Sequence, residues 1–151
     1  GIAKTIAELG EYAESLDHFL IAIEINERLK KVDYVISSYL AMGVMQSKAG
    51  NKDLARVHYA KVIEIAKFSK KPNENLRNAN NNIANTYIKS GNFVEAEKYL
   101  LKALAFVDNN NGENKQSEAQ LSWAKVKAVK EEYEKLSKEI FPDLKDSGLN
   151  F

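Results

Sequence analysis

Two histidines are the side chains in this chain best suited to metal binding or proton transfer. His18 and His58 occupy matching positions of two similar segments, each directly before an aromatic residue. A pair of imidazoles could bind a metal ion, but no third ligand lies at a suitable spacing, and a third segment has Tyr99 at this position. We interpret both histidines as repeated surface or inter-helix positions, and we predict no metal site.

The acidic residues and the short motifs do not point to catalysis either. Glu131 and Glu132 lie beside Lys130 and Lys135, which is typical of a solvated helical face with charges paired four residues apart. The chain has no Cys, no Gly-rich phosphate loop and no nucleophile motif. We therefore predict that the protein is not an enzyme and needs no cofactor.

Asparagine has the most unusual distribution. It is concentrated between residues 73 and 85, although Asn is less favourable in a helix than Ala by roughly several tenths of a kcal/mol per residue. Four residues share one narrow stripe of such a helix: Asn78, Asn82, Asn85 and Lys89. Amides both donate and accept hydrogen bonds, so this stripe could bind an extended peptide backbone. The alternative is a compositional bias, because residues 109–111 are also asparagine.

The composition limits the class of protein. With 151 residues, 44% of them hydrophobic, the chain has the size and apolar content of one globular domain. Its 22 Lys and Arg nearly cancel its 21 Asp and Glu, so we expect neither nucleic acid nor a membrane as the partner. No apolar run approaches the roughly 18 residues of a membrane span, and the first residues lack the basic-then-apolar order that is typical of a signal peptide. The absence of Cys suits a cytoplasmic protein, although exported proteins can also lack Cys.

The elements that carry these residues repeat along the chain. Gly10, Gly50 and Gly91 are 40 and 41 residues apart, and apolar residues recur every three or four positions in the segments around them. Each unit is therefore expected to be a helix, a tight turn at Gly and a second helix. Neither helix can bury its apolar side alone, so the units must stack.

Two short signatures recur within these units. A small residue lies four positions before a large one in each second helix, as Ser15 with Phe19, Ala55 with Tyr59 and, more loosely, Ala96 with Leu100. The first helices contain Tyr39, Met42 and Gly43 in one unit, and Ile83, Ala84 and Tyr87 in the next. With these signatures the chain resembles tetratricopeptide-repeat (TPR) proteins. The period is 40 to 41 residues, where about 34 is usual, and we expect no Pro at the end of the unit, where these repeats usually have one. The resemblance is therefore to lengthened repeats such as those in bacterial signalling and regulatory proteins.

The resemblance implies an all-α fold, a right-handed αα solenoid of three TPR-like helix pairs with a long C-terminal capping helix. The single domain would comprise repeat 1 at about 1–31, N-terminally incomplete, repeat 2 at about 32–71, repeat 3 at about 73–108, a capping helix at about 114–140 and a tail at 141–151. Helices are expected near 2–9, 12–31, 33–49, 52–70, 74–90, 93–108 and 115–140, with a loop at 108–112. The extra residues of each repeat should lengthen the helices around 26–33 and 66–75.

The last helix is predicted to cover the exposed end of the stack. Its apolar residues recur at helical spacing: Trp123, Val126, Val129, Tyr133, Leu136 and Ile140. If this stripe is buried, Leu136→Ala should cost about 2–5 kcal/mol of stability.

In the TPR arrangement the Asn stripe faces a concave groove. The predicted peptide-binding residues are Ser37, Leu40, Val44 and Lys48 from repeat 2, with Asn78, Asn81, Asn82, Asn85 and Lys89 from repeat 3. The resemblance implies a non-enzymatic scaffold that binds a protein or peptide, as the interaction or sensing segment of a bacterial regulatory protein. The alternative is a self-assembly module that docks through its open N-terminal edge and forms a homo-oligomer.

Overall fold

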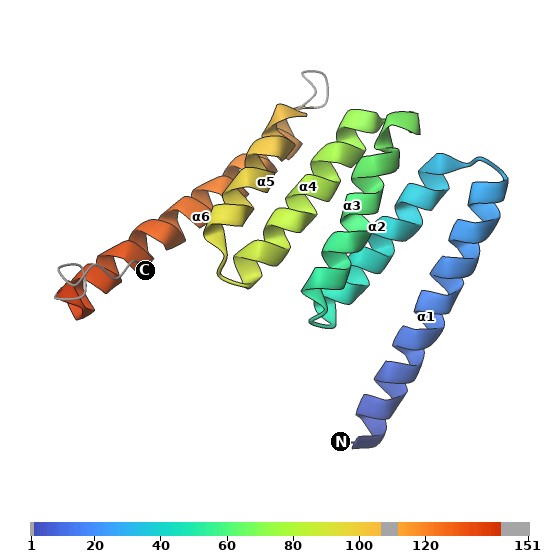
Figure 1. The fold of residues 1–151 in the computed structure, drawn as a ribbon, viewed down its shortest axis with the longest axis horizontal. Coiled ribbons are helices and arrows are strands. Elements are labelled where there is room, and N and C mark those ends of the chain that lie inside the picture. The colour runs from blue at the N-terminus through green and yellow to red at the C-terminus, as the bar shows by residue number, and fades with distance from the viewer. Residues whose placement is uncertain (1, 107–111, 143–151) are drawn as a thin grey trace.

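The protein is a row of helices. The structure, a computed structural model, describes residues 2–106 and 112–142. Within these residues there is no strand, and consecutive helices lie antiparallel and side by side (Figure 1). In chain order the elements are α1 (Ile2–Arg28), α2 (Val32–Lys48), α3 (Lys52–Ile65), the 3₁₀ helix η1 (Ala66–Phe68), α4 (Pro72–Lys89), α5 (Phe93–Ala105) and α6 (Gly112–Ile140). The predicted all-α solenoid is confirmed.

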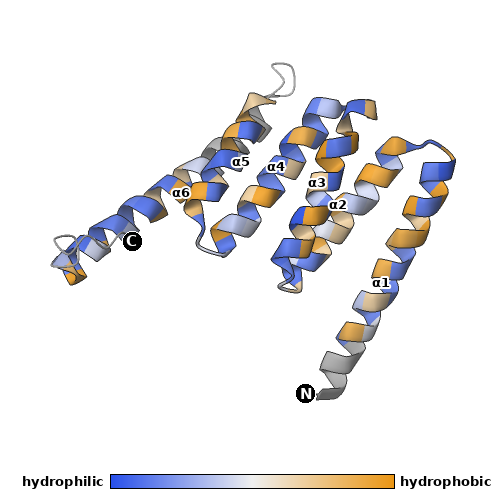
Figure 2. Cartoon of the chain, viewed as in Figure 1, coloured by the Kyte–Doolittle hydropathy of each residue, from blue (hydrophilic) through white to orange (hydrophobic). Residues whose placement is uncertain are grey.

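Each helix packs mainly against the next helix in the chain, and α2 also touches α4. Hydrophobic and hydrophilic residues alternate along the helices, as expected for elements that bury only one side (Figure 2). In the described ranges no helix combines the length and the apolar composition that crossing a bilayer requires. Most of the predicted loop at 108–112 and residues 143–151 of the predicted tail lie outside the described residues.

The turns at Gly50 and Gly91 follow one hydrogen-bonding pattern. Gly50 has a φ of 89° and Gly91 a φ of 76°, in the left-handed region that glycine adopts without steric cost. The N–H of Gly50 donates to Ser47 O at 3.1 Å, and that of Asn51 donates to Gln46 O at 2.8 Å. The N–H groups of Gly91 and the following residue make the equivalent bonds at 3.0 and 2.9 Å. These are Schellman motifs, which satisfy the last carbonyls of α2 and α4 and allow the chain to reverse.

The predicted turn at Gly10 is wrong, because α1 is one continuous helix. Helices were expected at 2–9 and 12–31, but Gly10 lies inside Ile2–Arg28. A Cβ at Gly10 would meet no heavy atom within 4 Å, so no neighbour requires glycine there. Glycine weakens a helix by roughly 1 kcal/mol relative to Ala without ending it. Gly50 and Gly91 are each followed by Asn, whereas Gly10 is followed by Glu11.

The turn between α1 and α2 is a Schellman motif without glycine. The N–H of Lys30 donates to Glu27 O at 3.1 Å, and that of Lys31 donates to Asn26 O at 2.9 Å. Lys30 takes the place of the glycine and has a φ of 54°. A side chain in this conformation costs roughly 1–2 kcal/mol. Because of this turn α1 ends at Arg28, three residues before the predicted end.

The second junction also differs from the prediction. The extra residues at 66–75 were expected to lengthen helices, but α3 ends at Ile65 and is followed by η1 and a short loop. Pro72 begins α4, and a proline disfavours helical conformation in the residue before it, so Lys71 has a φ of −130°. The hydroxyl of Ser69 donates to the carboxylate of Asp33, which fixes the loop to the start of α2. The expectation that no proline closes the repeat is therefore wrong, because Pro72 stands at this junction.

The two helices of each repeat pack through one pair of matching positions. Gly43 on α2 lies against the ring of Tyr59 on α3, since a Cβ on Gly43 would come within 2.4 Å of a ring carbon. Forty-one residues later, α4 has Ala84 and α5 has Leu100, both fully buried in one cluster. Ala84 is larger than Gly43, and Leu100 is smaller than Tyr59. The space between the two helices is therefore filled in both repeats.

The last helix covers the stack with only part of its length. The helix is unbroken, and Val126, which is 2% exposed, packs with Trp123 against the cluster that contains Leu100. The rest of the predicted apolar stripe is exposed: Val129, Tyr133, Leu136 and Ile140. The prediction that α6 caps the stack with this whole stripe is therefore wrong.

The lengths of the helices explain this difference. α5 has 13 residues and α6 has 29, which correspond to roughly 20 and 44 Å at about 1.5 Å per residue. Lys130 Nζ lies 3.8 Å from Glu97 Oε2, close to the first residue of α5. The two helices are antiparallel, so α6 runs past the turn between α4 and α5 (Figure 1). Beyond Lys130 it therefore has little of α5 left to cover.

Candidate functional site

Four of the predicted groove residues lie on α2, and they differ in accessibility. Leu40 is half-buried and packs against the core shared by α2, α3 and α4, so it serves mainly in packing. Val44 and Lys48 are exposed. Ser37 is exposed too, but its hydroxyl donates to Asp33 O at 3.1 Å within the helix. On α2, therefore, the side chains of Val44 and Lys48 are accessible to a binding partner.

The predicted stripe on α4 consists of half-buried amides. Asn78, Asn82 and Asn85 are half-buried, while Lys89 is exposed near the end of the helix. None of the three amides forms a hydrogen bond with another described residue. They lie at the surface of the helix that touches α2, so the α2 and α4 parts of the predicted groove belong to neighbouring helices.

Several asparagines outside the stripe are bonded. Asn26 Nδ2 donates to Ala22 O at 2.9 Å, Asn51 Nδ2 donates to Gln46 Oε1 at 3.0 Å, and Asn92 Oδ1 accepts from Glu95 N at 3.4 Å. Each of these amides stabilises a helix or a turn. The three amides of the stripe have no such role, so their donors and acceptors are available.

Asn80 and Asn81 carry buried carbonyls without partners. Asn80 is 2% exposed, and its Nδ2 donates to Leu76 O at 2.8 Å, but no described donor reaches its Oδ1. The Oδ1 of Asn81 is also buried and unpaired among the described residues, so this predicted site residue does not extend the accessible row. The matching positions of the preceding repeat are Tyr39 and Leu40. An Asn at an apolar position of the repeat is the sequence signal for these buried amides, and Asn80 was not among the predicted site residues.

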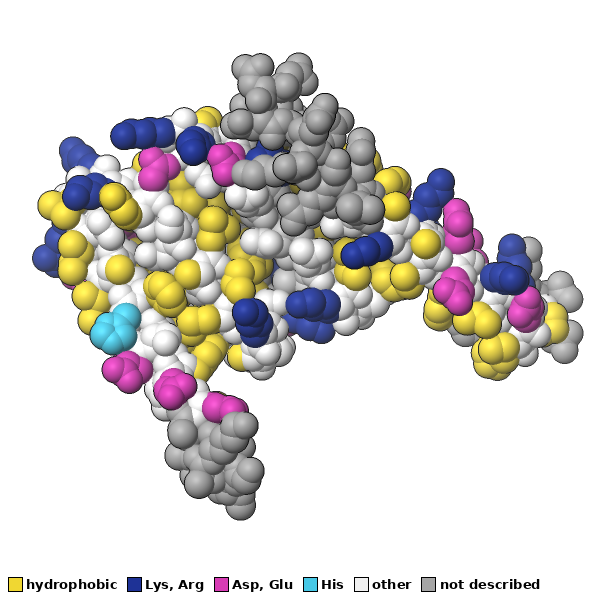
Figure 3. All heavy atoms as spheres, turned by 180° about the vertical axis from the view of Figure 1, so that it is seen from behind, with side chains coloured by type: hydrophobic (Ala, Val, Ile, Leu, Met, Phe, Trp, Pro, Cys, Tyr) yellow, Lys and Arg dark blue, Asp and Glu magenta, His cyan; other side chains and the backbone are white. Residues whose placement is uncertain are grey.

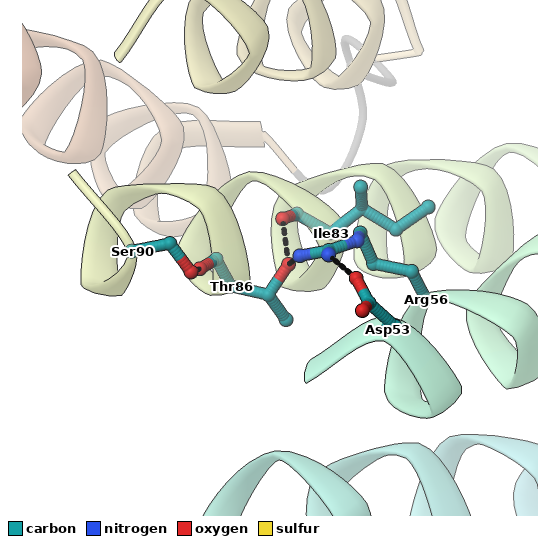
Figure 4. Close-up of polar contacts among 5 residues, drawn as sticks. All are labelled: Asp53, Arg56, Ile83, Thr86 and Ser90. Carbon is teal, nitrogen blue, oxygen red and sulfur yellow. Dashed lines mark hydrogen bonds and ion pairs between the residues drawn. The ribbon is translucent and has the colours of Figure 1, made fainter. Parts of the chain in front are cut away.

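A polar network joins α3 to α4 (Figure 4). Arg56 Nη1 donates to Thr86 Oγ1 at 3.0 Å, and Thr86 Oγ1 donates to Ile83 O at 2.7 Å. Ser90 Oγ donates to Thr86 O at 2.9 Å, and Arg56 also pairs with the carboxylate of Asp53. Thr86 is 1% exposed. Arg56 was not among the residues that the sequence predicted for the site. Its guanidinium group joins α3 to α4 through the bond to Thr86.

Aromatic rings extend this interface to α5. The guanidinium carbon of Arg56 lies 4.3 Å from the centroid of the Tyr87 ring, and Tyr87 stacks on Tyr99 of α5 with centroids 5.7 Å apart. Arg77, which is 5% exposed, donates to Phe106 O at 3.5 Å. These contacts hold α4 between its neighbours and fix the position of its half-buried amides.

The two histidines lie in different surroundings. His18 is exposed, with Nε2 3.7 Å from Glu14 Oε1 on the same helix. His58 is half-buried on α3 with its ring centroid 6.2 Å from that of Tyr39 on α2, and burial lowers its pKa. Across the part of the chain that the structure describes, no group of three or more His, Asp or Glu side chains could hold a metal ion.

Comparison with known families agrees with the fold. Residues 1–67 match a family model described as tetratricopeptide repeat, and residues 79–107 match a second model with the same description. The chain belongs to the tetratricopeptide-repeat family, as its signatures predicted. No curated protein matches the chain. Repeats of this family are non-catalytic scaffolds that generally mediate protein interaction.

Proposed function

We propose that this TPR domain binds an extended peptide or a partner helix of another protein across α2 and α4. The observation that supports the proposal is the row of Asn78, Asn82 and Asn85, three half-buried amides without hydrogen bonds to described residues. A peptide backbone offers N–H and C=O groups at regular intervals, and amides can pair with both. Val44 and Lys48 on α2 would add an apolar and a cationic contact.

We further propose that the domain serves as the interaction or sensing segment of a bacterial regulatory protein in the cytoplasm. The lengthened repeats and the absence of Cys support this context. Catalysis has no part in the proposal.

The test combines stability with binding. Asn82→Ala with Asn85→Ala should raise the stability of the fold by up to about 1 kcal/mol, because Ala is the better helix former. The same variant should lose about 1–3 kcal/mol of binding free energy through unpaired backbone groups of the ligand. That loss corresponds to a roughly 5- to 150-fold weaker Kd. The probe is a peptide selected on the parent chain from a random library, and isothermal titration calorimetry measures its Kd.

The matched control is Asn73→Ala. Asn73 is exposed on the same helix, outside the stripe, so its replacement should leave the Kd of the selected peptide unchanged. If the double variant binds the peptide as tightly as the parent, the row does not form the site. A library that yields no binding peptide would also contradict the proposal.

A second candidate is self-assembly through the open N-terminal edge. It is favoured by the large apolar side chains that α1 leaves exposed: Leu9, Leu20, Ile21, Ile25 and Leu29. Contiguous exposed apolar surface marks interaction sites in soluble proteins. This candidate predicts an association that depends on protein concentration.

A further inference from the structure

A cavity of about 370 Å³ opens between α1, α2 and α3, away from the proposed Asn row. It contains none of the predicted groove residues. Its walls come from the end of α1, the start of α2, the end of α3 and η1: Asn26, Glu27, Lys30, Val32, Val35, Lys61, Ile65 and Phe68. The volume is within the range of about 300–1,000 Å³ that is typical of ligand pockets.

The floor of this cavity is apolar. Val35 is 3% exposed, and Val32 and Ile65 are half-buried, so they form a continuous packed surface. Phe68 on η1 lines the cavity and is 67% exposed, which is unusual for a large aromatic side chain. An apolar side chain entering the cavity would cover Phe68 and remove this surface from water.

The surroundings of the cavity are cationic. Lys30 and Lys61 line it, and exposed lysines adjoin it in the sequence: Lys31, Lys67 and Lys70. Lys and Arg side chains gather at the end of the molecule where α1 meets α2, with hydrophobic side chains between them (Figure 3). Charge and apolar surface thus occur together at this end.

The acidic residues of this end are largely engaged. Lys61 Nζ lies 3.5 Å from Glu64 Oε2, and Asp33 accepts hydrogen bonds from the loop before α4. Glu27 lines the cavity and reduces its positive charge. Lys30 forms no ion pair with any described residue, so its ammonium group has no carboxylate partner among them.

The conformation of Lys30 is an independent observation that points to the same place. Its turn has the hydrogen bonds of the turns at Gly50 and Gly91, yet the left-handed position holds a lysine whose side chain lines the cavity. Glycine would fit this position without strain. Backbone strain that persists at a lining residue is typical of functional sites.

We infer that this cavity binds a large apolar side chain from an acidic peptide segment of a partner protein, with Lys30 and Lys61 binding the neighbouring carboxylates. The apolar floor accounts for the anchor side chain, and the lysines account for the acidic flanks by charge complementarity. A nucleic-acid backbone has no group that would use the apolar floor. A side chain of a peptide can enter a concave cavity, whereas a flat anionic membrane surface cannot.

The probe is a fluorescein-labelled peptide with one Phe flanked on each side by four Glu. Fluorescence anisotropy with the full chain should show saturable binding that weakens with added salt, because exposed charges are screened. Replacing Phe by Ser, or every Glu by Lys, should each weaken binding at least tenfold. If the Ser peptide binds as well as the Phe peptide, charge alone carries the binding and the cavity does not hold the anchor.

The decisive variant is Lys30→Gly. It should raise the Tm, by about 3–6 °C for each tenfold gain in the folding equilibrium constant, because the strain at Lys30 is relieved. It should also weaken peptide binding about tenfold, because the ammonium group is lost. Lys61→Ala should weaken binding without raising the Tm. Lys125→Ala, an exposed lysine on α6, is the matched control and should change neither quantity. A Lys30→Gly chain that binds the peptide as tightly as the parent would overturn the proposal.

Other occupants give distinct results. Binding to vesicles of phosphatidylserine and phosphatidylcholine that Lys30→Gly abolishes, without binding to the peptide, would assign the site to a membrane. Self-association of the parent that Lys30→Gly abolishes, without binding to the peptide, would assign it to a second copy of the chain. Both results would overturn the peptide proposal. The Asn82→Ala, Asn85→Ala variant should bind the acidic peptide like the parent, so the two proposed sites fail or succeed separately.

Discussion

Gly43 has no room for a side chain, because the ring of Tyr59 occupies the place of its Cβ. Gly43→Ala should therefore destabilise the fold by about 1–3 kcal/mol, the usual cost of overpacking, although Ala is the better helix former. Adding Tyr59→Leu creates the pair that Ala84 and Leu100 form in the next repeat, and it should recover most of the loss. Urea unfolding of both single variants and the double variant measures this coupling.

Gly10 provides the matched control at the residue scale. It also lies within a helix, but no heavy atom would be within 4 Å of its Cβ. Gly10→Ala should stabilise the fold by about 0.5–1 kcal/mol, because only the backbone entropy of glycine changes. Equal effects of Gly43→Ala and Gly10→Ala would show that contact with Tyr59 does not select glycine at residue 43.

His58 should make stability depend on pH. Burial beside α2 lowers its pKa in the folded chain, whereas the unfolded chain keeps the usual value of about 6.5. As the pH falls, the unfolded chain binds the proton first, so the contribution of His58 to stability is complete above about pH 7 and declines below about pH 6.5. His58→Tyr, which copies Tyr99, should reduce the fall in Tm between neutral and mildly acidic pH.

The control for this titration is His18→Tyr. His18 is exposed on α1, so this variant makes the same change of residue type outside the interface between α2 and α3. A His58→Tyr chain whose Tm falls with pH as steeply as that of the parent would mean that other groups cause the dependence.

At the scale of the element, α6 divides into a packed part and an exposed part. Val126 is 2% exposed, and Leu136 is 46% exposed. Val126→Ala should cost about 1–3 kcal/mol of stability, because it removes buried apolar groups and leaves a cavity. Leu136→Ala should cost less than about 1 kcal/mol, because a half-exposed side chain loses little contact. Guanidinium unfolding of the two variants gives both values.

A large effect of Leu136→Ala would have a different meaning. It would show that the exposed part of α6 is covered in solution, by a second copy or by residues outside those described. Measuring the variant at two protein concentrations separates these cases, because only association depends on concentration.

At the scale of the whole molecule, both ends of the stack expose apolar surface. Each helix of a solenoid contacts only its neighbours, so a terminal helix has one side without a partner. On α1 the exposed apolar side chains include Ile21 and Ile25, whereas Leu136 and Ile140 of α6 are exposed because they lie beyond the end of α5. Either end could therefore join two copies of the chain.

The proposed assembly through α1 can be tested directly. Sedimentation velocity over a wide concentration range should show a dimer for the parent and a monomer for Ile21→Glu with Ile25→Glu, because buried charge opposes association. Leu136→Glu with Ile140→Glu is the matched control on α6 and should leave the dimer intact. A parent chain that stays monomeric at all concentrations rules out self-assembly, and a dimer lost only with the α6 variant moves the interface to that end.

The sequence predicted the helices and the turns at Gly50 and Gly91 because their signals are local. Apolar spacing reports which side of a helix is buried, and glycine followed by a polar residue reports a left-handed turn. The same reasoning failed at Gly10, because glycine is compatible with both a helix and a turn. It also placed the end of the helix before Lys30 three residues too late, because the hydrogen bonds of the turn form there without glycine.

The candidate site was predictable only in part. Helical spacing placed Asn78, Asn82 and Asn85 on one stripe, but only the structure shows that these amides are half-buried and unbonded to described residues. The cavity between α1, α2 and α3 was not predictable, because its lining comes from segments up to 42 residues apart that meet only when the helices pack.

The sequence by itself determined the all-α class, the TPR family and the helical stripe of α6, since all three depend on residue types at short spacing. Only the tertiary structure decided which of these stripes is buried. Val126 and Leu136 belong to one apolar stripe, yet Val126 meets the core of α4 and α5, whereas Leu136 lies beyond the end of α5. Helical periodicity specifies the direction in which a side chain points, but burial requires a neighbouring element at that place, and that depends on how long the adjacent helix is and where it ends.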